Sequence, residues 1–329
     1  MRKLGSILGV LLVFAISALA LVMIYDKGKD QKPLRYADVP QETIDWINTL
    51  GNDLNDILSS FNPFPIPTPW DNKGDYGNDP DSGLKTLEDD YFIFYFPESL
   101  IEKAKFCQKE AHKAIPHLKD MMGKYYYPDD MNGRKVPIYL TEDQEGYNEV
   151  LSKFIRKNGN QGSAGVTIFE MSPSGIYLHA IALNGKYAFV NDEYTKIVIW
   201  HELNHYCFFA SLDYNQSINL PMWSFEGIAE YFAYEGERPS FSKNHIEDMR
   251  KECNLLDAYF PYTYQVYDGG RSIYCFMEDQ YKVSGIKAFI KTLYNSGIPT
   301  SMKQNFSISV PEFEKNWKDN LEEFTVKRQ

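Results

Sequence analysis

The sequence is short of cysteine and of basic residues. Its 4 cysteines in 329 residues are too few for a small scaffold held together by many disulfides. Its 34 Lys and Arg residues are outnumbered by 45 Asp and Glu residues, which gives a formal net charge of −11 at pH 7. Nucleic-acid binding is therefore not expected, because it requires a basic surface that neutralises phosphates. The chain also shows no internal repeat, which argues against a solenoid.

Apolar and aromatic side chains, in contrast, are abundant. Hydrophobic residues make up 43% and aromatic residues 15% of the chain, whereas disordered chains have low hydrophobicity and few aromatics. A folded core is therefore expected. Because single cores seldom grow beyond about 250–300 residues, the length allows one large domain or two smaller ones.

The N-terminal segment has the length of a membrane anchor. After Arg2 and Lys3, residues 4–25 contain no charge, and as a helix they would span about 33 Å, close to the hydrocarbon core of about 30 Å. The basic residues before the span place the N-terminus inside and the bulk of the chain outside the cytoplasm. Residues 18–20, Ala-Leu-Ala, match a signal cleavage site, so secretion after cleavage remains an open alternative.

Residues 26–90 have the composition of a tether. Proline, asparagine, aspartate and glycine cluster at 61–69 and 71–75, which excludes a long helix or a central strand there. One amphipathic stretch at 41–59 has apolar residues at helical spacing. The chain is therefore expected to contain a membrane anchor or signal segment at 1–25, a tether at 26–90, a sheet-bearing subdomain at 91–191 and a helical subdomain at 192–329.

The folded part is expected to begin with a sheet and to end with helices. Aromatic and β-branched runs predict strands, and apolar residues three to four positions apart predict helices. From residue 192 onward the pattern is mostly helical. The sequence therefore predicts an α+β fold in which the sheet comes first. The predicted strands are 91–96, 136–140, 165–170 and 175–183, and the predicted helices before residue 192 are 99–122 and 142–157.

The most informative stretch is residues 201–205, His-Glu-Leu-Asn-His. We expect it to lie on a helix capped by Asp192. At about 100° per residue, His201 and His205 are about 40° apart on one helix face, so their imidazoles can hold one metal ion. Glu202 lies beside them, where it can act as general base on a water molecule, as metal-assisted hydrolysis requires. A chance match in a helix with core histidines is the plain alternative.

A second motif supplies the ligand that two histidines lack. Zinc in a catalytic site takes three protein ligands, and Glu226 is the third candidate. It lies on a helix that we expect to start near Pro221 and to end at a C-cap glycine, Gly236. Gly227 removes a side chain, which we expect to let this helix approach the histidine helix closely. Glu230 lies on the same face as Glu226 and can accept a hydrogen bond from a zinc-bound imidazole, although a solvated helix charge is the alternative.

The two motifs resemble those of the gluzincin metallopeptidases, in particular a peptidase MA-like branch in which H-E-x-x-H is followed by a W-x-x-E-G-x-A-E-Y helix. Residues 221–231 here read Pro-Met-Trp-Ser-Phe-Glu-Gly-Ile-Ala-Glu-Tyr. The resemblance covers the chain from Tyr91 onward. It implies a thermolysin-like, gluzincin catalytic fold and one Zn²⁺ ion held by His201, His205 and Glu226.

Residues 267–270, Tyr-Asp-Gly-Gly, resemble the Y-x-x-G of the aminopeptidase branch of this family. The resemblance implies that Tyr267 points at the transition-state oxyanion, a role that suits a phenol donor. Because the chain contains 24 tyrosines, an ordinary packed tyrosine remains an open interpretation.

Other candidate residues carry less weight. His179 lies in a predicted strand and could line a cleft, although a lone strand histidine is more often structural. For the cysteines, a disulfide between Cys207 and Cys275 and a set of free buried thiols are both open, because four cysteines allow three connectivities. The remaining two cysteines are Cys107 and Cys253.

The sequence therefore predicts a membrane-anchored zinc metallopeptidase that hydrolyses peptide or protein substrates outside the cytoplasm. The predicted roles are a general base for Glu202, zinc ligation for His201, His205 and Glu226, and an oxyanion donor for Tyr267. The alternative is a non-catalytic, zinc-containing envelope or surface binding protein with a peptidase-like fold. Its signature would be a lost general base or a fourth protein ligand, and the sequence shows neither.

The predicted orientation can be tested with protease added to intact cells. We expect the domain to be digested without lysis, because it lies outside the cytoplasm behind residues 4–25. Soluble protein that begins near Leu21 would instead indicate signal cleavage. Protection of the domain until the cells are lysed would contradict the orientation.

Overall fold

The computed structural model describes residues 83–122, 135–154, 163–172, 175–212 and 220–325. All of them belong to the unit Pro63–Gln329. The predicted membrane segment at 4–25 and the amphipathic stretch at 41–59 lie outside the described residues. Among the helices that are described, none combines the length and the apolar character needed to cross a membrane.

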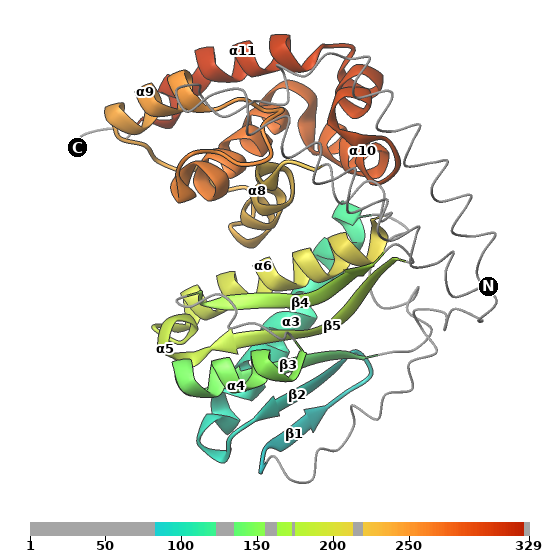
Figure 1. Cartoon of the computed structure of the whole chain (residues 1–329), viewed down its shortest axis with the longest axis vertical. Coiled ribbons are helices and arrows are strands. Elements are labelled where there is room, and N and C mark those ends of the chain that lie inside the picture. The colour runs from blue at the N-terminus through green and yellow to red at the C-terminus, as the bar shows by residue number, and fades with distance from the viewer. Residues whose placement is uncertain (1–82, 123–134, 155–162, 173–174, 213–219, 326–329) are drawn as a thin grey trace, which may run out of the picture. The chain divides into compact units, whose positions relative to one another are not determined.

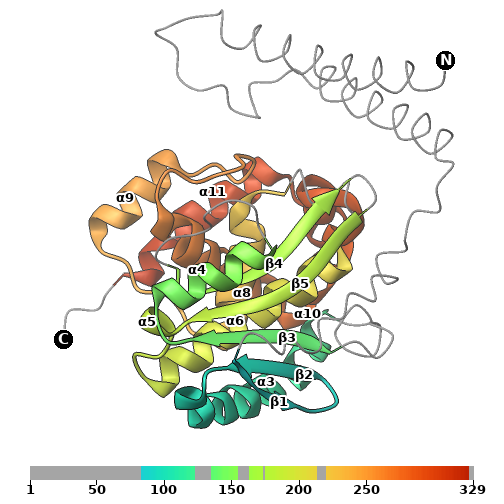
Figure 2. The ribbon, with the colours of Figure 1, turned by 60° about the horizontal axis from the view of Figure 1, so that its bottom comes forward.

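In the described part of the chain, five strands form one mixed sheet in the order β1-β2-β3-β5-β4 (Figure 2). The three central strands, β2, β3 and β5, are parallel, and each edge strand is antiparallel to its neighbour. The four predicted strands are confirmed. The strands are β1 (Lys85–Glu88), β2 (Phe92–Phe96), β3 (Val136–Thr141), β4 (Gly165–Ser172) and β5 (Gly175–Asn184).

Strand β1 was not predicted, because its residues fall within the tether predicted at 26–90. The boundary at residue 90 is therefore wrong, since Lys85 already pairs with Phe96 of β2. The strand escaped prediction for a physical reason: it has four residues and only Leu87 is partly buried, so it lacks the apolar run that marks a central strand.

Helices cover both faces of the sheet (Figure 2). On one face, α3 (Ile101–Met122) and α6 (Asp192–Ser211) pack on the larger core, which includes Ile138 and Ile181. On the other face, α4 (Gln144–Phe154) packs on a smaller cluster that includes Tyr139 and Ala180. The central strands are thus buried on both sides, which explains why their apolar runs are nearly continuous.

Helix α6 connects the sheet to the helical half of the protein (Figure 1). It contacts β4 and β5 on one side and α8 on the other. Twelve of its residues are buried, so beyond its exposed first turn the helix is covered on nearly all sides. A polar side chain on this helix is therefore held between two layers of the protein.

The rest of the described chain is helical, which confirms an α+β fold with the sheet first. Within α10, Lys282 and Gly297 have positive φ angles of 63° and 68° and interrupt the helix. The first piece of α10 therefore ends near Tyr281. The remaining elements are η2 (Glu98–Leu100), α5 (Gly185–Ala188), α8 (Met222–Ala233), α9 (Lys243–Glu252), η4 (Gln265–Gly269), α10 (Gly270–Phe306), α11 (Val310–Asn320) and η5 (Leu321–Phe324).

Candidate metal centre

Helix α6 presents two histidines on one face, as their spacing predicted. The imidazole rings of His201 and His205 lie with their centroids 4.5 Å apart and nearly perpendicular. The helix begins one residue earlier than predicted, because Asn191 is the N-cap and its side chain accepts a hydrogen bond from the backbone N–H of Tyr194. The capping role assigned to Asp192 is therefore wrong. Asp192 lies in the first turn instead, and it pairs with Lys103.

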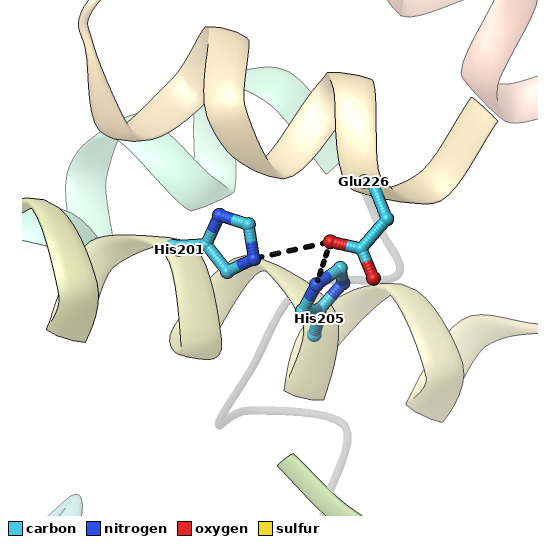
Figure 3. Close-up of side chains that lie close together, drawn as sticks. All are labelled: His201, His205 and Glu226. Carbon is cyan, nitrogen blue, oxygen red and sulfur yellow. Dashed lines mark hydrogen bonds and ion pairs between the residues drawn. The ribbon is translucent and has the colours of Figure 1, made fainter. Parts of the chain in front are cut away.

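Helix α8 brings Glu226 to the two histidines (Figure 3). Its Oε2 atom lies 3.3 Å from Nε2 of His201 and 3.1 Å from Nε2 of His205. In the described residues, these three side chains form the one group of His, Cys, Asp and Glu whose ligand atoms all lie within 4.8 Å of one another. The group is buried, so it is a built site rather than a surface coincidence. It can hold a metal ion.

The pKa values of His201 and Glu226 are both shifted by their mutual contacts, and the shifts indicate that a bound ion would replace a proton. Burial acts to lower the pKa of His201, but hydrogen bonds to Glu226 and Glu230 raise it well above the usual value. Burial acts to raise the pKa of Glu226, but the neighbouring His205 and His201 lower it below the usual range. In the absence of an ion, the raised pKa of His201 therefore favours a protonated imidazole. Because ligating imidazoles are neutral, metal binding at this site is coupled to proton release.

Glu230 contacts the other side of the first histidine. Its Oε1 atom lies 3.1 Å from Nδ1 of His201, one helical turn beyond Glu226 on the same face of α8. A carboxylate at Nδ1 fixes the tautomer that leaves Nε2 free to bind a metal ion. The position is the one that the spacing predicted, and the effect on a bound ion remains a prediction.

The imidazole of His205 is held differently. Its Nδ1 atom is buried and has no hydrogen-bond partner among the described residues. The rings of Phe209 and Phe225 lie 5.9 Å and 6.0 Å from its ring centroid. Packing against these two aromatic rings therefore orients His205. His201, in contrast, is oriented by the carboxylate of Glu230.

Glu202 lies next to the metal centre without joining the ligand group. It is only 5% exposed, and burial raises the pKa of its carboxyl above the usual value. The hydroxyl of Thr167 on β4 lies 2.8 Å from its Oε2 atom and 2.9 Å from its backbone oxygen. A Cβ atom at Gly165 would lie 2.9 Å from both Cγ and Oε1 of Glu202. Gly165 and Thr167 of β4 thus pack closely against this carboxylate, and we call these two residues the wall of β4.

Sequence reasoning did not identify Thr167 or Gly165. The stretch 165–170 was predicted as a strand, but nothing in its local pattern indicates that it lies against Glu202, which is 35 residues further along the chain from Thr167. The alternation of residues 165 and 167 on one side of the strand is the one signal that points to a shared partner.

Gly227 allows a close helix contact, but with a different partner from the one predicted. A Cβ atom at Gly227 would lie 2.6 Å from the carbonyl carbon of Gly270, at the start of α10. Helix α8 does pack against α6, but the role predicted for Gly227 in that contact is wrong, because the space beside this glycine is filled by Gly270. One residue beyond Glu226 is about 100° further round the helix, so Gly227 faces away from the histidines. The contact brings η4 and α10 against α8.

Because η4 packs against α8, Tyr267 of η4 lies beside the metal centre. It belongs to η4, a short π-helical turn, and its ring stacks on that of His201 at a centroid distance of 6.1 Å. Burial and the carboxylates of Glu226 and Glu202 raise the pKa of its phenol, so it keeps its proton and can donate a hydrogen bond. Its role as oxyanion donor remains a prediction.

The other candidates lie outside the group. His179 on β5 stacks on Phe154 of α4 with ring centroids 5.8 Å apart. All four cysteines are buried and none is part of a disulfide, so of the two alternatives the buried thiols are confirmed and the disulfide between Cys207 and Cys275 is not formed. In comparisons with known proteins, the chain matches no protein-family model and no curated sequence.

Removing ligands should remove the metal. We expect one bound ion per purified chain, and almost none after His205→Ala and Glu226→Ala together. Thermal stability should also lose the contribution of metal binding, which is about 2.7 kcal/mol at an ion concentration 100 times the Kd. The matched control is His179→Ala with Glu170→Ala, a His–Glu pair outside the group. Unchanged metal content in the double ligand variant would rule out this site.

Proposed function

We propose that the protein is a zinc-dependent metallopeptidase of gluzincin type, anchored by residues 4–25 with its catalytic domain outside the cytoplasm. The observation that supports this most is the combination of a three-donor group with a separate carboxylate. His201, His205 and Glu226 converge on one point, and Glu202 is held next to them by β4.

The donor set fits zinc. Two imidazole nitrogens and one carboxylate oxygen are common zinc ligands, and three protein ligands leave a fourth position open in a catalytic site. Among the described residues, no fourth His, Cys, Asp or Glu joins the group. This supports a catalytic site over a structural one, which would be closed by four protein ligands.

In this proposal the zinc ion supplies Lewis-acid chemistry, which polarises the peptide carbonyl and makes water more acidic. Glu202 takes a proton from the attacking water and delivers it to the leaving amine. Thr167 holds one carboxylate oxygen of Glu202, which limits the side chain to a narrow range of orientations. Tyr267 donates a hydrogen bond to the oxygen on which negative charge develops.

The direct test of the reaction is Glu202→Gln. The variant keeps the size of the side chain and removes the base, so metal content and folding should be unchanged. Cleavage of a mixed peptide library, read by mass spectrometry, should fall by about 10²–10⁴-fold. Glu110→Gln is the matched control, since Glu110 is a carboxylate buried on α3 and paired with Lys113.

Two outcomes would contradict the peptidase. One is a wild-type protein that cleaves nothing in the library with its metal demonstrably bound. The other is Glu202→Gln cleaving as fast as wild type. Either result would favour the alternative, a non-catalytic zinc-containing envelope or surface binding protein.

A second test probes the wall that β4 provides. Thr167→Val keeps the shape but removes the hydroxyl, and a hydrogen bond to a charged group contributes about 1.5–3 kcal/mol. We therefore expect kcat to fall about 10- to 100-fold with KM and metal content nearly unchanged, and Thr167→Ser to restore most of the rate. Thr292→Val is the control, because Thr292 also loses a hydroxyl hydrogen bond, to Ala288.

Gly165→Ala should also lower kcat, because the added methyl group would clash with the side chain of Glu202. The added methyl group would lie 2.9 Å from Glu202 Oε1, which forces the carboxylate to move. Gly146→Ala is the matched control, because its nearest neighbour would be an ordinary contact of 3.5 Å. Normal kcat values for both Thr167→Val and Gly165→Ala would show that β4 does not position the base.

A further inference from the structure

A small polar cavity lies between α10 and α11, which pack against each other (Figure 1). Its volume is about 250 Å³, slightly below the roughly 300–1,000 Å³ of sites for drug-sized ligands, so it suits a molecule of one ring. We call it the α10–α11 cavity. It shares no lining residue with the metal centre. The lining residues are Phe276, Gln280, Tyr281, Asn316, Asp319 and Asn320.

The spacing of the lining residues explains why two helices share one cavity. On α10, Phe276 and Gln280 are four residues apart. On α11, Asn316 and Asn320 are also four residues apart. Residues at this spacing lie about 40° from each other on one helix face. The α10–α11 cavity is therefore lined by two facing rows of side chains, one from each helix.

Contacts behind the α10–α11 cavity hold the two helices together. Phe276 packs against Phe313 of α11, with ring centroids 5.4 Å apart. The indole N–H of Trp317 on α11 donates a hydrogen bond to the hydroxyl of Ser272 on α10, over a distance of 3.0 Å. Both Trp317 and Ser272 are fully buried. The helices that form the two walls are therefore in place before a ligand binds, which lowers the entropic cost of binding.

Asn320 provides the observation that points to a ligand. It precedes η5, at a position where an asparagine side chain commonly caps a helix, but here its side chain makes no capping hydrogen bond. Its Oδ1 atom is buried and has no hydrogen-bond partner among the described residues. An unpaired buried acceptor is unfavourable. Because Asn320 lines the cavity, rotation of its amide can turn this oxygen toward a donor on a ligand.

Two further amides face solvent at the same cavity. The side chains of Gln280 and Asn316 are exposed and have no hydrogen-bond partner within the described part of the chain. An amide offers both donors and an acceptor. A sugar hydroxyl also donates and accepts, so three amides around one small cavity match the hydroxyls of a sugar ring.

The rest of the lining favours a neutral ligand. Asp319 is its one charged residue, and its carboxylate pairs with Lys315 at 2.6 Å. The lining contains no Lys, Arg or His among the described residues, so a phosphate or carboxylate group would lack the cation that it requires. Tyr281, whose ring stacks on Phe306 with centroids 4.0 Å apart, supplies apolar ring surface and a hydroxyl. Such a ring suits the C–H groups of a sugar.

We propose that the α10–α11 cavity binds a neutral saccharide, either a free sugar or one ring of a polysaccharide chain. The amide of Asn320 accepts a hydrogen bond from a sugar hydroxyl at the inner end of the cavity, and Gln280 and Asn316 bind further hydroxyls at its mouth. This is a binding activity in addition to the chemistry of the metal centre, and it uses none of the same residues.

The test is binding of sugars to the full chain, purified in a detergent without a sugar headgroup. Saturation-transfer NMR compares neutral monosaccharides and neutral oligosaccharides with two charged counterparts, glucose 6-phosphate and glucuronate. We expect the neutral sugars to bind in preference to the charged ones. Tighter binding of oligosaccharides than of monosaccharides assigns the cavity to a polysaccharide, and equal binding assigns it to a free sugar.

Variants locate the binding in the cavity. Gln280→Ala and Asn316→Ala each remove an exposed amide, so folding should be unchanged, and each should weaken binding about 2- to 12-fold through one lost hydrogen bond. Asn320→Leu should weaken binding by at least as much, whereas Asn320→Asp retains the acceptor oxygen and should restore most of the affinity. The controls are Gln304→Ala on α10 and Asn244→Ala on α9, which remove exposed amides outside the cavity and should bind as wild type does.

Three results would overturn the saccharide site. They are a wild-type chain that binds none of the neutral sugars, binding that Gln280→Ala, Asn316→Ala and Asn320→Leu all leave unchanged, and charged sugars that bind as tightly as neutral ones. The outcome does not depend on the peptidase. Loss of cleavage in Glu202→Gln should leave sugar binding unchanged, and loss of sugar binding in Gln280→Ala should leave peptide cleavage unchanged.

Discussion

The close packing of α8 against α6 is the constraint on which the site depends. It brings one carboxylate oxygen of Glu226 within 3.3 Å of the Nε2 atoms of both His201 and His205. The neighbouring elements hold this pair of helices from either side. Strands β4 and β5 support α6 from below, and the glycine contact between Gly227 and Gly270 fixes α10 against α8. A side chain at either glycine would separate backbones that now touch, and the carboxylate would lose its place.

This arrangement places several ionisable side chains close together in the buried interior of the protein. Glu202, Glu226 and Glu230 are all near two imidazoles, and burying such groups is unfavourable unless each is compensated. Because this group can hold a metal ion, a bound divalent cation would compensate the carboxylate charge in place of a proton on His201. Glu202 does not belong to the ligand group, and its carboxylate accepts a hydrogen bond from the hydroxyl of Thr167 instead.

The parts of the site that sequence could predict are those set by local geometry. The spacing of four residues in α6 placed both histidines on one face, and the same spacing in α8 placed Glu230 on Nδ1 of His201. Contacts between distant segments could not be predicted. The wall of Thr167 and Gly165, the true partner of Gly227 and the short exposed strand β1 all depend on how the elements pack. The N-cap is Asn191 rather than the predicted Asp192, because a sequence pattern defines the first residue of a helix only to within one or two positions.

The central claim is that His201, His205 and Glu226 hold a zinc ion with one position left for solvent or substrate. A crystal structure of the zinc-loaded protein, with anomalous scattering measured at the zinc edge, tests it most directly. The account predicts a single anomalous peak about 2.0–2.2 Å from both Nε2 atoms and from a Glu226 oxygen, with solvent as the fourth ligand. A map without a peak at this group, or a peak closed by a fourth protein side chain, would contradict it.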